Sequence, residues 1–195
     1  DLKPSNIMVG ADDHVSVLDF GLARLAQQEG RPHEETLTTP GMVLGSCPYM
    51  APEQALGQKV APPSDIFSCG AVMYEALSGR RAFEGTTPMR VLQAVVRCEV
   101  APLREAAPAV PEALARVVDR CLEKDLERRY PTAVDLARDL AKAAECHDER
   151  VPGPVAGRGD GGGRDVRPAG RREWAWALAA GLAGLALGLA IGLVL

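Results

Sequence analysis

The sequence begins with DLKPSNIMVGADDHVSVLDFG, residues 1–21, and the fold assignment starts from this stretch. Two short runs rich in β-branched residues flank the turn-forming residues GADDH, which predicts a β-hairpin. Folding that hairpin about Asp12 and Asp13 places Asn6 opposite Asp19 at its open end. An amide oxygen and a carboxylate meeting there would suit Mg²⁺, which binds oxygen ligands together with substrate phosphates. The spacing alone also fits a plain hairpin with polar ends.

The composition describes a globular protein with room for one ordinary domain and appendages. The chain has 195 residues and a net charge of −4, with 47% hydrophobic and 25% charged residues. Because no basic stripe is present to neutralise phosphates, we exclude nucleic acid as a main partner. The 5 cysteines form no C-x-x-C pair, so we expect buried, reduced thiols in a cytosolic domain.

The composition changes sharply along the chain and predicts three parts. Residues 1–146 read as a folded domain, and residues 147–173 form a linker rich in Gly, Pro and Arg. The uncharged stretch WAWALAAGLAGLALGLAIGLVL, residues 174–195, predicts a transmembrane helix, which needs roughly 20 apolar residues. The chain is then either tail-anchored or continues beyond Leu195.

The flanks of this stretch predict its orientation. Four arginines lie between residues 164 and 172, and positive charge stays on the cytoplasmic side. Trp174 and Trp176 would anchor the helix at that interface. We therefore expect a single-pass protein of the cell membrane with its folded domain in the cytoplasm.

Small residues recur every four positions in the same stretch, at Ala180, Gly184, Gly188 and Gly192. Such a stripe allows two membrane helices to approach closely, which predicts a homodimer. Gly and Ala are also common in membrane helices that do not pair, so both readings stay open.

Four stretches of the sequence together resemble the eukaryotic-like protein kinases. DLKPSN followed by DFG resembles their catalytic loop and metal-binding motif. GSCPYMAPEQ (45–54) resembles the end of the activation segment, and SDIFSCGAVMYEALSGRRAF (64–83) resembles the long buried helix of the C-lobe. CLEKDLERRYPTAVDLARDL (121–140) resembles the last two helices of that lobe. The residues of these four stretches are most similar to those of bacterial membrane-anchored serine/threonine kinases.

The resemblance implies a mostly α fold with a short β-hairpin at the N-terminus: a kinase C-lobe only, plus one transmembrane helix. Helix-start signals at Thr87, Pro111 and Thr132 agree with this. The resemblance starts at the catalytic aspartate, so it does not include the N-lobe with its phosphate-covering glycine-rich loop. We therefore expect residues 1–195 by themselves to be inactive.

The resemblance also assigns roles at the catalytic loop. Asp1 would accept the proton of the substrate hydroxyl, and Lys3 would lie near the γ-phosphate of ATP. Asn6 and Asp19 would hold the Mg²⁺ (or Mn²⁺) ions that bridge the ATP phosphates. Ser46, in the substrate-docking loop, stands where the family usually has threonine, whose hydroxyl bridges the catalytic aspartate and lysine.

The activation segment offers candidates for phosphorylation. TLTTPG, residues 36–41, contains Thr36, Thr38 and Thr39 in a polar stretch bounded by Pro and Gly. A phosphate there could order the segment by pairing with arginine. An unmodified loop is the alternative.

Three further matches imply structural roles. Glu53 would pair with Arg129 and hold the activation segment against the lobe. Asp65 would hold the catalytic loop by accepting hydrogen bonds from its backbone. Ser64 is expected as the N-cap of the long helix and Gly79 as its end.

These residues predict a serine/threonine protein kinase that transfers the ATP γ-phosphate to hydroxyls of protein substrates in membrane-anchored signalling. The alternative is a non-catalytic membrane adaptor that uses a kinase C-lobe as a docking surface. The metal-ligand residues favour the enzyme, since an adaptor has no physical need for them. A lipid or small-molecule kinase is disfavoured by the activation segment, which docks a polypeptide.

Overall fold

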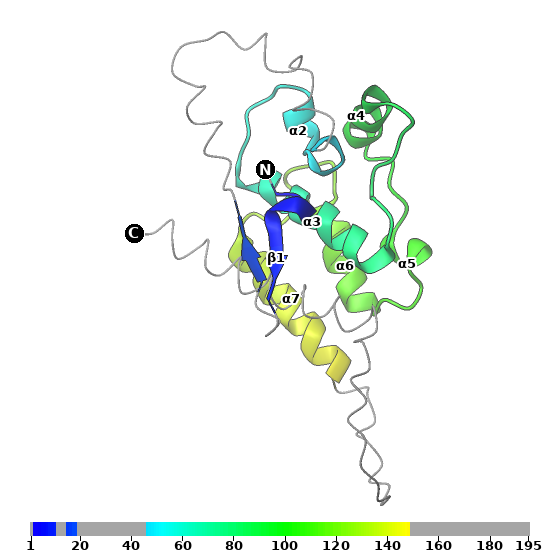
Figure 1. Cartoon of the computed structure of the whole chain (residues 1–195). Coiled ribbons are helices and arrows are strands. Elements are labelled where there is room, and N and C mark those ends of the chain that lie inside the picture. The colour runs from blue at the N-terminus through cyan, green and yellow to red at the C-terminus, as the bar shows by residue number, and fades with distance from the viewer. Residues whose placement is uncertain (1, 11–14, 19–45, 149–195) are drawn as a thin grey trace, which may run out of the picture.

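The computed structural model describes residues 2–10, 15–18 and 46–148, which form a short β-hairpin followed by a helical body (Figure 1). The described part is mostly helical with a two-stranded antiparallel sheet, and this confirms the predicted fold class for it. The elements, in chain order, are η1 (Pro4–Asn6), β1 (Ile7–Val9), β2 (Val15–Val17), η2 (Cys47–Tyr49), α2 (Pro52–Ala55), α3 (Pro62–Ser78), α4 (Pro88–Arg97), α5 (Leu103–Ala106), α6 (Glu112–Cys121) and α7 (Ala133–Asp148), where η marks a single 3-10 turn.

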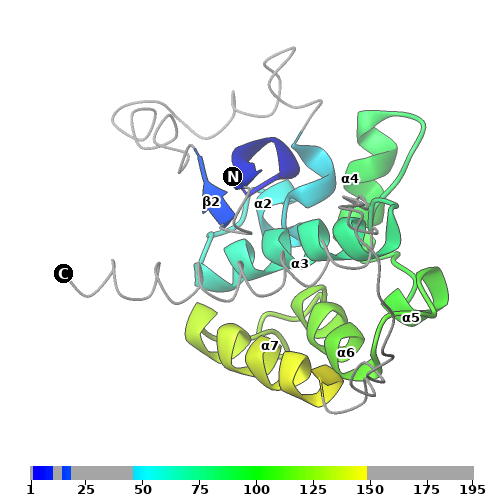
Figure 2. The same cartoon turned by 60° about the horizontal axis from the view of Figure 1, so that its bottom comes forward.

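The 17-residue helix α3 is the centre of the body. In Figure 2 it lies between α6 and α7 on one side and α2 with the hairpin on the other. Its apolar side chains are buried nearly all round, and Phe67 stacks on Phe83 with ring centroids 5.5 Å apart. Burying one such side chain stabilises the fold by about 1.5–3 kcal/mol. The buried side chains of α3 together hold the other elements against this helix.

The start of α3 differs from the prediction and its end agrees with it. Pro62 and Pro63 occupy the first turn, where a missing N–H costs nothing, and Ala61 is the extended residue before it. The prediction of Ser64 as the N-cap was wrong, because the two prolines begin the helix earlier and Ser64 becomes its third residue. Gly79 ends the helix in the left-handed conformation with φ 72°, as expected of a glycine stop.

Helix α6 approaches α3 closely at Gly70. A Cβ built on Gly70 would lie only 2.5 Å from the Cβ of Cys121, so no larger residue fits without moving one helix. α6 in turn packs on α7, and the core runs continuously from α3 through both helices.

The other predicted helix starts are confirmed. The Thr87 hydroxyl accepts a hydrogen bond from the Arg90 N–H at 3.3 Å and caps α4. The Thr132 hydroxyl accepts from the Asp135 N–H at 3.2 Å and donates to the Asp135 carboxylate at 2.6 Å, which caps α7. α6 begins directly after Pro111.

The predicted register of the hairpin was wrong by one residue. Val9 pairs with Val15 and Ile7 with Val17, and the Leu18 N–H donates to the Asn6 carbonyl at 2.7 Å. Asn6 is therefore opposite Leu18 and not opposite Asp19. The observed connection, residues 10–14, is odd in number, whereas the predicted turn centred between Asp12 and Asp13 requires an even number.

Among the described residues, burial raises the pKa of the thiols of Cys47, Cys69, Cys98 and Cys121, that of Cys69 to about 12. These thiols stay protonated at neutral pH, which agrees with the expectation of structural, reduced cysteines.

The linker from residue 149 onward and the predicted transmembrane helix at residues 174–195 lie outside the described part of the chain. Among the helices within residues 46–148, none is long and apolar enough to cross a membrane.

Candidate active site

The structure brings Lys3 and Ser46 together from segments that are 43 positions apart. Lys3 is extended just before η1, and Ser46 directly precedes η2. The Lys3 Nζ donates a hydrogen bond to the Ser46 Oγ at 3.2 Å, and both residues are half-buried. The loop that opens the chain and the segment resembling a substrate-docking loop therefore share one site.

Asn6 lies beside this pair and is fixed by its backbone. Its N–H donates to the Lys3 carbonyl at 2.9 Å, and its own carbonyl accepts from the Leu18 N–H. The residue is buried, with 9% of its surface exposed, and its Oδ1 accepts a hydrogen bond from the Ser5 hydroxyl at 3.5 Å. A buried amide oxygen held in place by the backbone is a suitable ligand for Mg²⁺. The expected second ligand, Asp19, follows Leu18 but lies outside the described residues.

Several expected site residues cannot be placed in this geometry. Asp1 and the phosphorylation candidates Thr36, Thr38 and Thr39 lie outside the described part, like Asp19. Within the described part, no group of three or more His, Cys, Asp or Glu side chains lies together as a metal site.

Tyr49 links the Ser46 segment to the end of α3, a contact that the sequence did not suggest. Its hydroxyl donates to the Glu75 Oε2 at 2.6 Å. Burial, followed by the hydrogen bond to the Glu75 carboxylate, raises the pKa of Tyr49 to about 12. Glu75 also faces Arg81 at 3.9 Å, so the segment after Ser46 is held on α3 through a buried tyrosine and a partly exposed carboxylate.

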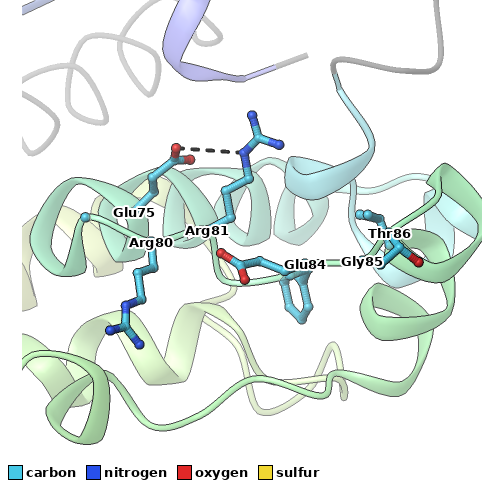
Figure 3. A pocket seen from close by; sticks show the side chains of 9 residues that line it. Glu75, Arg80, Arg81, Glu84, Gly85 and Thr86 are labelled. Atoms are coloured by element: carbon cyan, nitrogen blue, oxygen red, sulfur yellow. Dashed lines mark ion pairs between the residues drawn. The ribbon is translucent and has the colours of Figure 1, made fainter.

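An open surface pocket of about 710 Å³ lies at this end of α3. Figure 3 shows Glu75 and Arg81 pointing toward one another, whereas Arg80 extends to the other side of the chain. Glu84 also lines the pocket, so its two acidic and two basic side chains balance. Because the charges cancel, the lining does not select an anionic or a cationic ligand.

Glu53 and Arg129 form a buried, bidentate ion pair. The Arg129 Nη1 lies 2.9 Å from the Glu53 Oε1, and the Nη2 lies 3.0 Å from the Oε2. The other three guanidinium N–H groups donate to the carbonyls of Pro63, Glu123 and Lys124. All five donors of this buried arginine are therefore satisfied, and α2 is tied to α3 and to the segment before α7.

The surroundings of Glu53 keep it ionised. Burial by itself raises the pKa of this carboxyl, but hydrogen bonds from Arg129 and Ser64 outweigh burial, and the pKa lies below its ordinary value. The Ser64 hydroxyl contributes through a 2.6 Å hydrogen bond to the Glu53 Oε1. Sequence reasoning missed this contact because it assigned Ser64 to a helix cap.

The expected contact of Asp65 with the catalytic loop stays a prediction, because Asp1 at the start of that loop lies outside the described residues. Asp65 itself is exposed in the first turns of α3.

Residues 1–140 match the sequence profile of the protein kinase domain family. The chain belongs to the protein kinase domain family. The match covers the hairpin, the Lys3–Ser46 contact and the Glu53–Arg129 pair, so all three lie within one kinase domain.

Three relatives of this chain are bacterial proteins named as serine/threonine kinases, one of them as a probable one. The serine/threonine-protein kinase PknB of Mycolicibacterium smegmatis is 38% identical over 78% of this chain. A probable serine/threonine-protein kinase of Clostridium acetobutylicum is 37% identical over 72% of the chain, and the serine/threonine-protein kinase pkn2 of Myxococcus xanthus is 37% identical over 78%. The chain spans 24%, 20% and 19% of the length of these three relatives.

Proposed function

We propose that this chain supplies the C-lobe side of the active site of a serine/threonine protein kinase, which transfers the γ-phosphate of ATP to hydroxyl groups of proteins. The observation that carries the proposal is the hydrogen bond between Lys3 and Ser46. It joins a cation to the segment beside which a protein substrate would dock. The match to the kinase family and the serine/threonine kinases among the relatives support the same reaction.

In this proposal each side chain acts by position and charge. Lys3 offsets the charge that develops on the transferred phosphoryl group, and Ser46 keeps its ammonium group in place. Asn6, together with Asp19, holds Mg²⁺ or Mn²⁺, and Asp1 accepts the proton of the attacking hydroxyl. The metal ion, when bound, neutralises charge on the ATP phosphates.

The test is phosphate transfer from labelled ATP to a protein substrate by the full-length protein carrying Lys3→Met. We expect the rate of transfer to fall by about a hundredfold or more, the effect of removing one preorganised charge-stabilising donor. Lys142→Met is the matched control, because Lys142 is exposed on α7 and pairs with Asp139 on the same helix. Transfer at the wild-type rate by Lys3→Met contradicts the proposed role of Lys3.

The same assay separates the kinase from an adaptor. A full-length protein that binds Mg·ATP but phosphorylates no protein, including itself, is an adaptor and not a kinase. If transfer occurs, mapping of phosphopeptides tests modification at Thr36, Thr38 and Thr39, which we propose as the activating sites.

We also propose that residues 174–195 anchor this domain in the cell membrane, with the domain on the cytoplasmic side. The support is the uncharged stretch itself and the arginines between residues 164 and 172 that precede it. Extraction of membranes with alkaline carbonate tests the anchor. Retention of the wild-type chain and release of a chain truncated before Trp174 are expected, whereas release of both removes the proposal.

A further inference from the structure

The hydroxyl of Ser64 sits at the contact between α2 and the first turn of α3. Ser64 is fully buried, with 0% of its surface exposed. Its Oγ donates to the Glu53 Oε1 at 2.6 Å and accepts from the Ala61 N–H at 3.3 Å. The hydroxyl therefore joins the start of α3 to the carboxylate that Arg129 holds from the other side.

Arg129 links the Glu53 carboxylate to α3 only indirectly. Its guanidinium reaches α3 through the Pro63 carbonyl, at 3.1 Å, and through the Phe67 ring, whose centroid lies 4.8 Å from Cζ. Its other bonds go to Glu53 and to the carbonyls of Glu123 and Lys124. The direct link from the Glu53 side chain to α3 is the bond from Ser64. Because the site is buried, water cannot replace this hydroxyl without a local rearrangement.

We propose that Ser64 is a positioning residue, whose hydroxyl fixes the Glu53 carboxylate on α3 and thereby holds residues 46–55, the segment that carries Ser46. The position of the Ser46 hydroxyl near Lys3 then depends on a serine in a different helix. The functional importance of that position rests on the proposed kinase activity. The effect of Ser64 on the placement of residues 46–55 does not.

The chain offers a matched control in Ser68, one turn further along α3. Ser68 is also buried, and its hydroxyl donates to the backbone carbonyl of Ser64 at 3.3 Å. Ser64→Ala and Ser68→Ala remove the same atom from the same helix, but only Ser64→Ala removes a bond to a carboxylate.

The first readout is amide hydrogen exchange in the full-length protein. The N–H groups of Ala55, Leu56 and Gln58 donate to carbonyls of residues 51–53 and report on opening of α2. In Ser64→Ala we expect these amides to exchange at least about tenfold faster, the fold-change for losing a hydrogen bond to a charged group. In Ser68→Ala we expect exchange close to the wild-type rate.

The second readout is the pH dependence of unfolding by urea. The Ser64 bond lowers the pKa of Glu53, so its contribution to stability is present while Glu53 is ionised and shrinks as the pH falls and Glu53 becomes protonated. The excess loss of stability of Ser64→Ala over Ser68→Ala should therefore be larger at neutral than at acid pH.

Equal exchange of α2 amides in the two variants, or an excess loss that does not change with pH, overturns the inference. If Ser64→Ala does not fold, Ser64→Cys replaces the hydroxyl with a somewhat larger thiol that is a weaker donor, and wild-type exchange in that variant also overturns the inference. Neither readout requires phosphate transfer, so a failed kinase assay with a positive exchange result refutes only the proposed function.

Discussion

Replacing Arg129 with methionine tests how much of the fold depends on one buried ion pair. The Arg129 side chain has 0% and the Glu53 side chain 4% of its surface exposed. Methionine fills most of the volume of arginine but donates no hydrogen bond. The Glu53 carboxylate then loses both bonds to the guanidinium and keeps the one from Ser64.

The expected cost is large because a buried charge is left without its partner. Breaking a buried pair from one side costs about 3–5 kcal/mol, and three backbone carbonyls lose a donor as well. The whole free energy of unfolding of a domain is about 5–15 kcal/mol. Arg129→Met should therefore remove a substantial share of the stability at pH 7.

The pH dependence identifies the cause of the loss. In the wild type the pKa of Glu53 is lowered, so its stabilisation is present above the unfolded pKa of about 4.3 and is lost as the pH falls through the lower folded pKa. In Arg129→Met burial is opposed by the hydrogen bond from Ser64 but no longer by Arg129, so the pKa of Glu53 lies higher than in the wild type. Lowering the pH then protonates Glu53 and reduces the destabilisation of the variant. The difference in unfolding free energy between the two proteins should shrink between pH 7 and pH 5.

The assay is urea unfolding of the full-length protein, followed by the helical circular dichroism signal at both pH values. Arg128→Met is the control, because the Arg128 side chain is 72% exposed and only faces Asp125 at 3.9 Å. We expect the control to change the unfolding free energy by no more than about 0.5 kcal/mol. A loss in Arg129→Met that is small, or that stays constant between the two pH values, refutes the reasoning.

Three further substitutions give measurable outcomes. Gly70→Ala should lower the unfolding free energy by about 1–3 kcal/mol, since the added Cβ meets the Cys121 Cβ at 2.5 Å, and an unchanged urea midpoint would mean that the helices can separate freely. Tyr49→Phe should lower the unfolding free energy by about 1 kcal/mol, because the hydrogen bond to Glu75 is lost. Since folding raises the pKa of Tyr49 to about 12, this tyrosine should make the wild type less stable as the pH rises above 10, and Tyr49→Phe should remove that decline. An equal alkaline decline in wild type and variant counts against that contact. Gly188→Ile should abolish association of the membrane segment, measured by energy transfer between labelled copies in vesicles, and undiminished transfer removes the proposed dimer.

Much of the helical body was predictable because its signals are local. A threonine hydroxyl at Thr87 or Thr132 bonds to an N–H only a few residues away, and Gly79 adopts a positive φ at little cost. Each of these helix starts and ends depends only on residues that are close in the sequence. It can therefore be predicted without knowing how the helix packs against the rest of the protein.

The errors arose where neighbouring signals competed or where pairing depended on length. Ser64 is a good capping residue, but Pro62 and Pro63 start α3 earlier and free its hydroxyl for Glu53. The hairpin was recognised from its turn residues, but its register pairs Val9 with Val15 and leaves an odd connection, one residue away from the predicted pairing.

By itself, the sequence determined the order of the motifs, the predicted kinase family, the end of α3 and the starts of α4, α6 and α7 to within a few residues. These features depend on residue type and on spacing along the chain. Only the tertiary structure decided that the Ser46 hydroxyl meets Lys3, that Tyr49 bonds to Glu75, and that Ser64 joins the ion pair. Each of these bonds links residues that packing around α3 brings together, and a hydrogen bond over 2.6–3.2 Å depends on side-chain positions that residue spacing does not encode.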